Sequence, residues 1–172
     1  MPPSANKKYL LLDSCIAEYC LNKDMQPKIT KQLEKWAGNI FDFAISELSY
    51  AELINGAYKE KVDRVKELLD SYSRIEVSQR VLRGAGVLGN VYKAQDNRNG
   101  NINLADRIIA ATSFSYNIPI VTANVKDFPY PFFKVIIDED LIYKKGSKNV
   151  LLSTCVLFPS TSVLNYWHSK TK

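Results

Sequence analysis

Hydrophobic residues occur in two kinds of stretch along the chain, a pattern typical of α/β folds. Short apolar runs predict strands at 9–13, 40–45, 74–77, 120–121, 133–137 and 150–158. Longer stretches with apolar residues three or four positions apart predict helices at 15–21, 27–36, 47–58, 62–72, 79–95 and 104–117. We therefore expect a three-layer α/β/α domain with a central parallel sheet, whose first strand is buried on both faces.

Residues that start and stop helices mark several of these boundaries. Ser14 and Ser46 can cap the helices that follow them, because a hydroxyl oxygen can accept from a free backbone N–H. Asn103 can cap the next long apolar helix, which carries Asp106 in its first turn and ends before Pro119. This arrangement places a carboxylate at the beginning of a buried helix.

The totals exclude several classes of protein. With 172 residues, of which 46% are hydrophobic and 24% are charged, the chain can bury a core as one domain. Three cysteines without a metal-binding spacing fit a reducing cytoplasm better than a disulfide framework, and no apolar run is long enough to span a membrane. The single histidine, His168, excludes a two-histidine ribonuclease mechanism within one chain and argues against a zinc site.

Acidic residues lie where strands end and helices begin. Asp13 ends the first strand, Asp106 begins the helix at 104–117, and Glu52 lies on the helix at 47–58. Either Asn124 or Asp127, after the strand at 120–121, completes the set. The carboxyl ends of parallel strands meet at one sheet edge, so these side chains can converge and hold Mg²⁺ or Mn²⁺, which prefer oxygen ligands. In the plainer interpretation, Asp13 is a cap or turn residue and Glu52, although it shares a helix side with Leu48, is a surface glutamate.

Three segments resemble the motifs of PIN-domain ribonucleases, which include the VapC-type toxins of bacterial toxin–antitoxin pairs. The segments are 9–13, 45–53 and 104–128, with the sequences YLLLD, ISELSYAEL and LADRIIAATSFSYNIPIVTANVKDF. The resemblance implies a metal-dependent endoribonuclease that cleaves RNA phosphodiester bonds with a metal-activated water. It also implies Asp13, Glu52 and Asp106 as metal ligands. The fourth position of the family pattern holds Asn124, with Asp127 three residues further on, so either residue can be the fourth ligand.

Polar and basic neighbours of these residues complete the expected site. Ser14 and Thr122 are donors that can orient the carboxylates. Basic residues can hold the RNA backbone, and the candidates are Lys7, Lys8, Arg98 and Arg107. The net charge of +5 suits a polyanionic partner, although it fits an ordinary solvated surface equally well.

The resemblance further implies partners for the protein. A VapC-type toxin would act on RNA in the cytoplasm, would be inhibited by an antitoxin whose segment blocks the acidic site, and would commonly form a homodimer. Two alternatives stay open: a PIN-like nuclease in RNA processing, and a catalytically silent module that binds RNA or protein. The intact acids Asp13, Glu52 and Asp106 argue against the silent module.

Two stretches lie outside this interpretation. Residues 84–89, GAGVLG, match the G-x-G-x-x-G pattern of dinucleotide sites. They fall inside a predicted helix rather than directly after a strand, so we expect close helix packing instead. The resemblance covers about 9–137, which predicts a nuclease domain at 1–137 and a C-terminal extension at 138–172, packed on the same domain and ending in a polar tail at 165–172.

Overall fold

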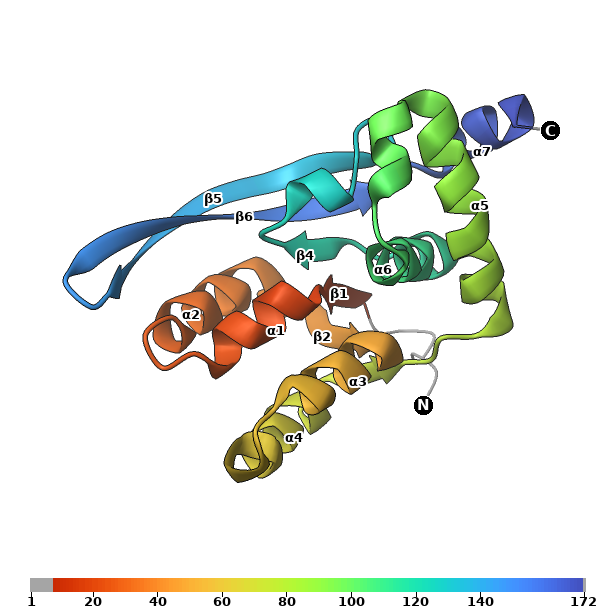
Figure 1. Cartoon of the computed structure of the whole chain (residues 1–172). Coiled ribbons are helices and arrows are strands. Elements are labelled where there is room, and N and C mark those ends of the chain that lie inside the picture. Colours follow the sequence, from red (N-terminus) through yellow and green to blue (C-terminus); the bar gives the residue numbers. More distant parts are fainter. Residues whose placement is uncertain (1–7, 172) are drawn as a thin grey trace.

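The computed structural model describes residues 8–171, apart from the side chain of residue 60, and it has an α/β architecture (Figure 1). The strands are β1 (Lys8–Leu12), β2 (Phe41–Ser46), β3 (Ser73–Ile75), β4 (Ile120–Thr122), β5 (Phe133–Lys145) and β6 (Lys148–Pro159). The helices are α1 (Ser14–Leu21), α2 (Gln26–Ala37), α3 (Glu47–Gly56), α4 (Val62–Asp70), α5 (Gln79–Gln95), α6 (Leu104–Tyr116) and α7 (Thr161–Lys170). Short 3₁₀ helices are η1 (Lys59–Lys61), η2 (Asn97–Asn101) and η3 (Val125–Asp127), of which η2 occupies the stretch between the helices predicted at 79–95 and 104–117.

All six strands form one sheet in the order β3-β2-β1-β4-β6-β5. The first four of these strands are parallel, which confirms the predicted central parallel sheet. Strand β6 runs antiparallel to β4, and β5 runs antiparallel to β6 at the edge of the sheet. The carboxyl ends of β1 and β4 therefore lie side by side, at the edge where the acidic residues were expected.

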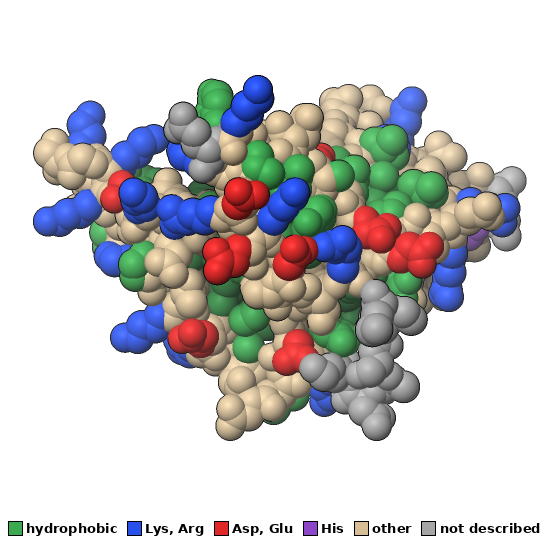
Figure 2. Space-filling view, turned by 90° about the horizontal axis from the view of Figure 1, so that it is seen from below, with side chains coloured by type: hydrophobic (Ala, Val, Ile, Leu, Met, Phe, Trp, Pro, Cys, Tyr) green, Lys and Arg blue, Asp and Glu red, His purple; other side chains and the backbone are tan. Residues whose placement is uncertain are grey.

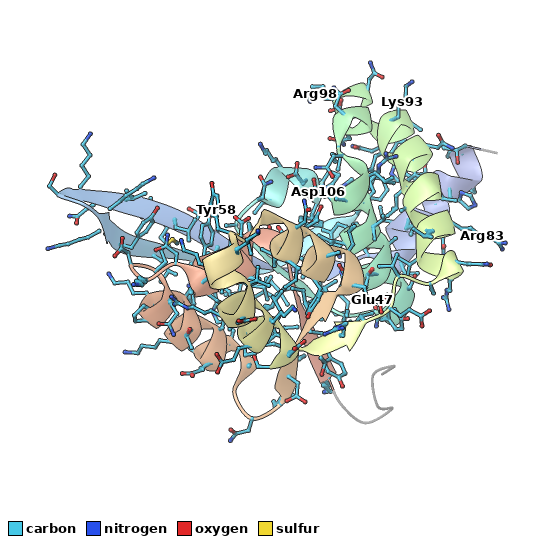
Figure 3. All side chains as sticks on the ribbon, turned by 60° about the horizontal axis from the view of Figure 1, so that its bottom comes forward. Glu47, Tyr58, Arg83, Lys93, Arg98 and Asp106 are labelled. Atoms are coloured by element: carbon cyan, nitrogen blue, oxygen red, sulfur yellow. The ribbon has the colours of Figure 1, made fainter. Side chains whose placement is uncertain are left out.

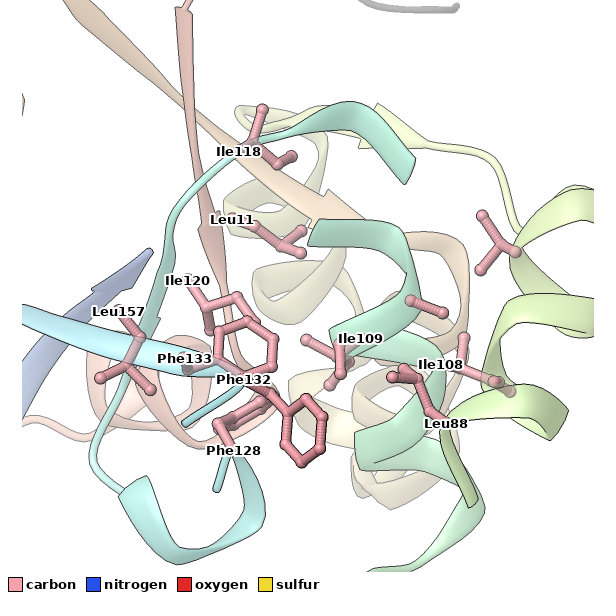
Figure 4. Packing of buried hydrophobic residues seen from close by; sticks show 14 of the residues in the cluster. Leu11, Leu88, Ile108, Ile109, Ile118, Ile120, Phe128, Phe132, Phe133 and Leu157 are labelled. Carbon is pink, nitrogen blue, oxygen red and sulfur yellow. The ribbon is translucent and has the colours of Figure 1, made fainter. Parts of the chain in front are cut away.

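Helices cover both faces of the sheet and explain why the first strand is apolar at successive positions. Leu10 and Leu12 pack with residues of α1 and α2 on one face. Tyr9 and Leu11 pack with residues of α5 and α6 on the other face, where Leu11 lies near Ile109 (Figure 4). Because neighbouring residues of a strand point to opposite faces, a strand covered on both sides needs apolar residues throughout. The predicted three-layer arrangement is confirmed.

Two of the three predicted helix caps form as expected. The Ser46 hydroxyl accepts a hydrogen bond from the Ser49 N–H at 3.1 Å, at the start of α3. The side-chain oxygen of Asn103 accepts from the Asp106 N–H at 2.9 Å, at the start of α6. At its other end, α6 stops at Asn117, which adopts the left-handed conformation with a φ of 52°. These bonds hold Asp106 in the first turn of α6.

The glycine pattern at 84–89 lies within α5 and serves helix packing, as predicted. A Cβ added at Gly84 would lie 3.4 Å from the Ala111 side chain of α6. At Gly89, the guanidinium of Arg107 occupies the space that a side chain would need. Gly84 and Gly89 therefore lie against side chains of α6, whereas Gly86 faces open space. The pattern forms no strand-to-helix turn of the kind that a dinucleotide requires.

The C-terminal third differs most from the prediction. Strands β5 and β6 form a long hairpin, and β5 continues past residue 137, with a shift of its pairing register between Val135 and Ile137. The polar tail predicted at 165–172 was wrong: within the described residues it belongs to α7, whose Val163, Leu164 and Trp167 pack against the core. These three residues form the side of α7 that contacts the core, and this contact is not apparent from the sequence of the segment alone. The division of the chain at residue 137 stays a prediction.

Candidate active site

Asp13 lies directly beyond β1, next to the end of β4. Its backbone N–H donates to the Val121 carbonyl at 3.0 Å, so the main chain aligns the two strand ends. The side chain is only 5% exposed, and its Oδ2 accepts hydrogen bonds from Thr122 Oγ1 at 2.7 Å and from Cys15 Sγ at 3.1 Å. A buried carboxylate is therefore held in one orientation by two donors.

Asp106 approaches the same edge from the first turn of α6, near the centre of the molecule (Figure 3). The pKa of its carboxyl is raised from 3.8 to about 6, most of all by burial and then by the carboxylates of Asp127, Asp13 and Glu52 in that order. The hydrogen bond from Asn103 acts in the opposite direction. Four carboxylates from four different elements therefore repel one another at this edge, which is the condition that a bound cation relieves.

Asp127 and Asn124 meet through the short helix η3. The side-chain amide of Asn124 donates to Asp127 Oδ2, and the Asn124 backbone N–H donates to Thr122 Oγ1 at 2.8 Å. Burial raises the pKa of Asp127, Lys126 lowers it, and Asp13 raises it again. The two candidates for the fourth position are therefore in direct contact, and the neutral amide orients the charged carboxylate.

Glu52 reaches the site from α3. Its side chain is exposed, whereas Leu53 of the same helix packs with residues of α1 and α4. Its Oε2 accepts a hydrogen bond from Ser14 Oγ at 3.0 Å. The prediction that Ser14 caps α1 was wrong, since the helix begins at Ser14 and the preceding Asp13 makes no side-chain capping bond. The Ser14 hydroxyl instead holds the carboxylate of Glu52.

The arrangement of these carboxylates suits a divalent cation that keeps some of its water ligands better than one coordinated by protein atoms alone. Among the residues that the structure describes, no three histidine, cysteine, aspartate or glutamate side chains converge into a single coordination shell. Mg²⁺ does not need such a shell, because it keeps several waters and usually binds through one or two carboxylates. The pKa of Asp106 is raised by burial and then by three neighbouring carboxylates, and such partly buried, clustered oxygen ligands fit a divalent cation.

The basic residues predicted to hold RNA are dispersed. Lys7 lies outside the described residues, and Lys8 begins β1 at the opposite end from Asp13, about 16 Å away at the rise of a strand. Arg98 forms a 2.6 Å salt bridge with Asp96. Arg107 packs against α5 at Gly89, and its Nε donates to the Asn103 carbonyl at 3.3 Å. Their role in RNA binding stays a prediction.

One neighbour of the site was not predicted at all. Cys15 contacts both Asp13 and Thr122, with its Sγ 3.8 Å from Thr122 Oγ1. Burial and the nearby Asp13 carboxylate raise the pKa of its thiol to about 12, so it stays protonated and can donate. Its position two residues after a strand-end acid, in the first turn of a helix, is the signal that could have revealed it.

Comparison with known proteins agrees with this geometry. The model of the PIN domain family matches residues 10–129. Ribonuclease VapC10 of Mycobacterium tuberculosis is 36% identical over 86 residues, which are 50% of this chain and 62% of that protein, less than two thirds of its length.

Solved structures extend the comparison to three dimensions. A toxin–antitoxin complex from Klebsiella pneumoniae contains a chain that is 26% identical, with a TM-score of 0.58 over 71% of this chain and 92% of that one. A DNA-bound VapBC from Salmonella typhimurium shows the same fold at 18% identity, with a TM-score of 0.58 over 73% of this chain and 93% of that one. The family model spans well over half of the sequence, including all four acidic positions, and the protein therefore belongs to the PIN domain family.

Proposed function

We propose that the protein is a VapC-type endoribonuclease that hydrolyses RNA phosphodiester bonds with the help of Mg²⁺ or Mn²⁺. The observation that carries this proposal is the convergence of Asp13, Glu52, Asp106 and Asp127 at one sheet edge, where burial and then the three other carboxylates raise the pKa of Asp106. Clustered carboxylates of this kind are costly unless they serve a cation or a proton transfer.

Each residue has a distinct part in the proposed site. Asp13, Asp106 and Asp127 would hold the cation, and Glu52 would complete its surroundings from the exposed side. When bound, such an ion neutralises charge on the phosphate and lowers the pKa of water.

Three donors keep the carboxylates in place for this task. Thr122 donates to Asp13, Ser14 donates to Glu52, and the Asn124 amide donates to Asp127. Such outer donors matter for a metal site because they hold each ligand oxygen in the direction that the ion requires. In this proposal Asn124 acts through Asp127 and is a positioning residue.

The relatives support a toxin role within a two-protein system. One relative is named a ribonuclease, and the Klebsiella pneumoniae structure is a toxin–antitoxin complex. We therefore include in the proposal an antitoxin partner that covers the acidic site, assembly as a homodimer, and action on RNA in the cytoplasm. Within residues 8–171, no helix is both long and apolar enough to cross a membrane.

The direct test compares cleavage of labelled RNA by the parent and by Asp13→Asn, with Mg²⁺, with Mn²⁺ and with EDTA. We expect the parent to cleave only with the added ion, and the variant to lose at least about a hundredfold in rate, since even outer residues of metal sites cost up to that much. Asp63→Asn is a suitable control because Asp63 is an exposed first-turn acid of α4.

Two results would contradict the proposal. One is undiminished cleavage after rigorous chelation, with contaminating nuclease excluded by purification of the Asp13→Asn variant in parallel. The other is wild-type turnover by a folded Asp13→Asn protein, which would remove this carboxylate from the reaction. A loss of activity with a lowered melting temperature would instead give Asp13 the structural role of a turn residue.

A further inference from the structure

The β5–β6 hairpin extends far past the sheet edge that carries the acidic site. Thr122, the last residue of β4, pairs with Cys155 of β6. The seven residues of β6 from Lys148 to Thr154 therefore run beyond the carboxyl end of β4, a length of about 24 Å at the rise of an antiparallel strand. Figure 1 shows the hairpin as an arm that leaves the body of the molecule on this side.

The end of this arm is positively charged. Lys144, Lys145 and Lys148, which we call the basic tip, are all exposed and flank the turn at Gly146. Asp140 is the last acidic residue of the sequence, and residues 141–172 contain no aspartate or glutamate. The arm thus changes from acidic near the site to basic at its end.

Helix α2 adds positive charge beside the arm. Lys28, Lys31 and Lys35 lie on the exposed side of α2. Lys28 Nζ donates to the Ile142 carbonyl, and Lys35 forms a 2.7 Å salt bridge with Glu139, so α2 and the arm are held together. Figure 2 shows blue side chains gathered at the end of the molecule where the arm and α2 lie.

We propose that the basic tip binds the sugar–phosphate backbone of an RNA strand that continues beyond the point of cleavage. This inference rests on the proposed function and adds a substrate class to it, namely RNA long enough to reach from the carboxylates to the tip. The overhang of about 24 Å corresponds to roughly seven nucleotides of stacked strand at 3.4 Å each.

Two features of the arm favour a polyanion as its partner. Three flexible, exposed cations without a neighbouring acid suit repeated phosphates, which bind through charge and release of counterions. The basic tip also lies outside residues 10–129, so the features shared with the PIN domain family do not account for it. An acidic protein segment would meet the same charges, and the experiment below distinguishes it from RNA.

The test measures RNA binding in EDTA, where a metal-dependent nuclease cannot cleave. The triple variant Lys144→Gln/Lys145→Gln/Lys148→Gln is compared with the parent by fluorescence anisotropy. The probes are labelled single-stranded RNAs of about 20 and about 6 nucleotides, of which only the longer can reach the tip from the site. A matched control, Arg80→Gln/Arg83→Gln/Lys170→Gln, removes the same charge from exposed residues on α5 and α7, with Arg83 far from the arm (Figure 3).

For the longer RNA, we expect the tip variant to bind about tenfold more weakly than the parent, and the slope of log affinity against log salt to fall by about 2, from about 0.7 for each of three lost contacts. The tip variant should lose no more affinity for the shorter RNA than for the longer one, and the control variant should retain most of its affinity for both probes. Unchanged melting temperatures establish that each variant is folded.

Two outcomes would overturn the inference: unchanged affinity of the tip variant for the longer RNA, or an equal loss in the control variant. The first outcome would leave an acidic protein segment as the partner of the basic tip. Failure of the proposed function looks different, since a protein that binds RNA through the tip but never cleaves it with Mg²⁺ or Mn²⁺ contradicts the nuclease alone.

Discussion

Replacing Asp106 with asparagine should stabilise the metal-free protein, although Asp106 belongs to the proposed active site. Its pKa rises from 3.8 to about 6 on folding, first through burial and then through three neighbouring carboxylates. At 1.36 kcal/mol per pKa unit, ionised Asp106 costs at most about 3 kcal/mol of folding free energy above pH 6. The side chain is half-buried, so solvent screening reduces this to about 1 to 2 kcal/mol.

The sign of the effect follows from proton binding. Between pH 3.8 and about 6 the folded state holds the Asp106 proton more tightly than the unfolded state, so metal-free stability falls as the pH rises through this range. Asparagine carries no charge and escapes the penalty at every pH. Its advantage should be largest at pH 7.5, should fall to about half at pH 5, and should vanish below pH 3.8, where both states are protonated.

Thermal unfolding in EDTA, followed by circular dichroism, measures this advantage. An increase of 1 kcal/mol raises the melting temperature by about 2 to 4 °C in a domain of this size. Asp63→Asn is the matched control, because it also removes a first-turn acid and loses about 0.3 to 1 kcal/mol of helix-dipole stabilisation. Added Mg²⁺ should reverse the order by raising the melting temperature of the parent more than that of Asp106→Asn.

The prediction is refuted if Asp106→Asn melts at or below the temperature of Asp63→Asn at both pH 5 and pH 7.5. That result would mean that neither burial nor the neighbouring carboxylates penalise ionised Asp106 in the folded protein. A stabilisation without any response to Mg²⁺ or Mn²⁺ would retain the acidic cluster but remove the cation from the proposal.

Further predictions concern the neighbours of the cluster. Asp127→Ala should raise the Mn²⁺ concentration needed for half-maximal RNA cleavage more than Asn124→Ala does, because Asn124 acts through its hydrogen bond to Asp127, and the opposite order would exchange their roles. Thr122→Val should slow cleavage about 10- to 100-fold by removing a donor from Asp13, and Thr122→Ser should restore it; equal rates in both variants would contradict an orienting role. The Cys15 thiol, with its pKa raised to about 12, should react with iodoacetamide at pH 8 only after unfolding, and rapid labelling of the native protein, located by mass spectrometry, would show an ionised thiol.

The sequence by itself determined the features that depend on neighbouring residues. A continuous apolar run before Asp13 is enough to predict a doubly covered strand, since only such a strand needs apolar side chains on both faces. Asn103 identified the start of α6 because capping involves residues only three positions apart, and this cap placed Asp106 in the first turn. The position of GAGVLG inside a helical stretch excluded a dinucleotide turn for the same local reason.

Only the tertiary structure decided which distant side chains meet. Ser14 and Glu52 are 38 positions apart, and their hydrogen bond depends on how α1 packs against α3, which no local pattern reports. By contrast, Asn124 and Asp127 are only three positions apart, so their contact across η3 is local. The C-terminal third was hardest to predict because its hairpin is covered on only part of its length and α7 becomes amphipathic only against the core. Hydrophobic periodicity records what a segment can bury, whereas packing against the rest of the chain decides what it does bury.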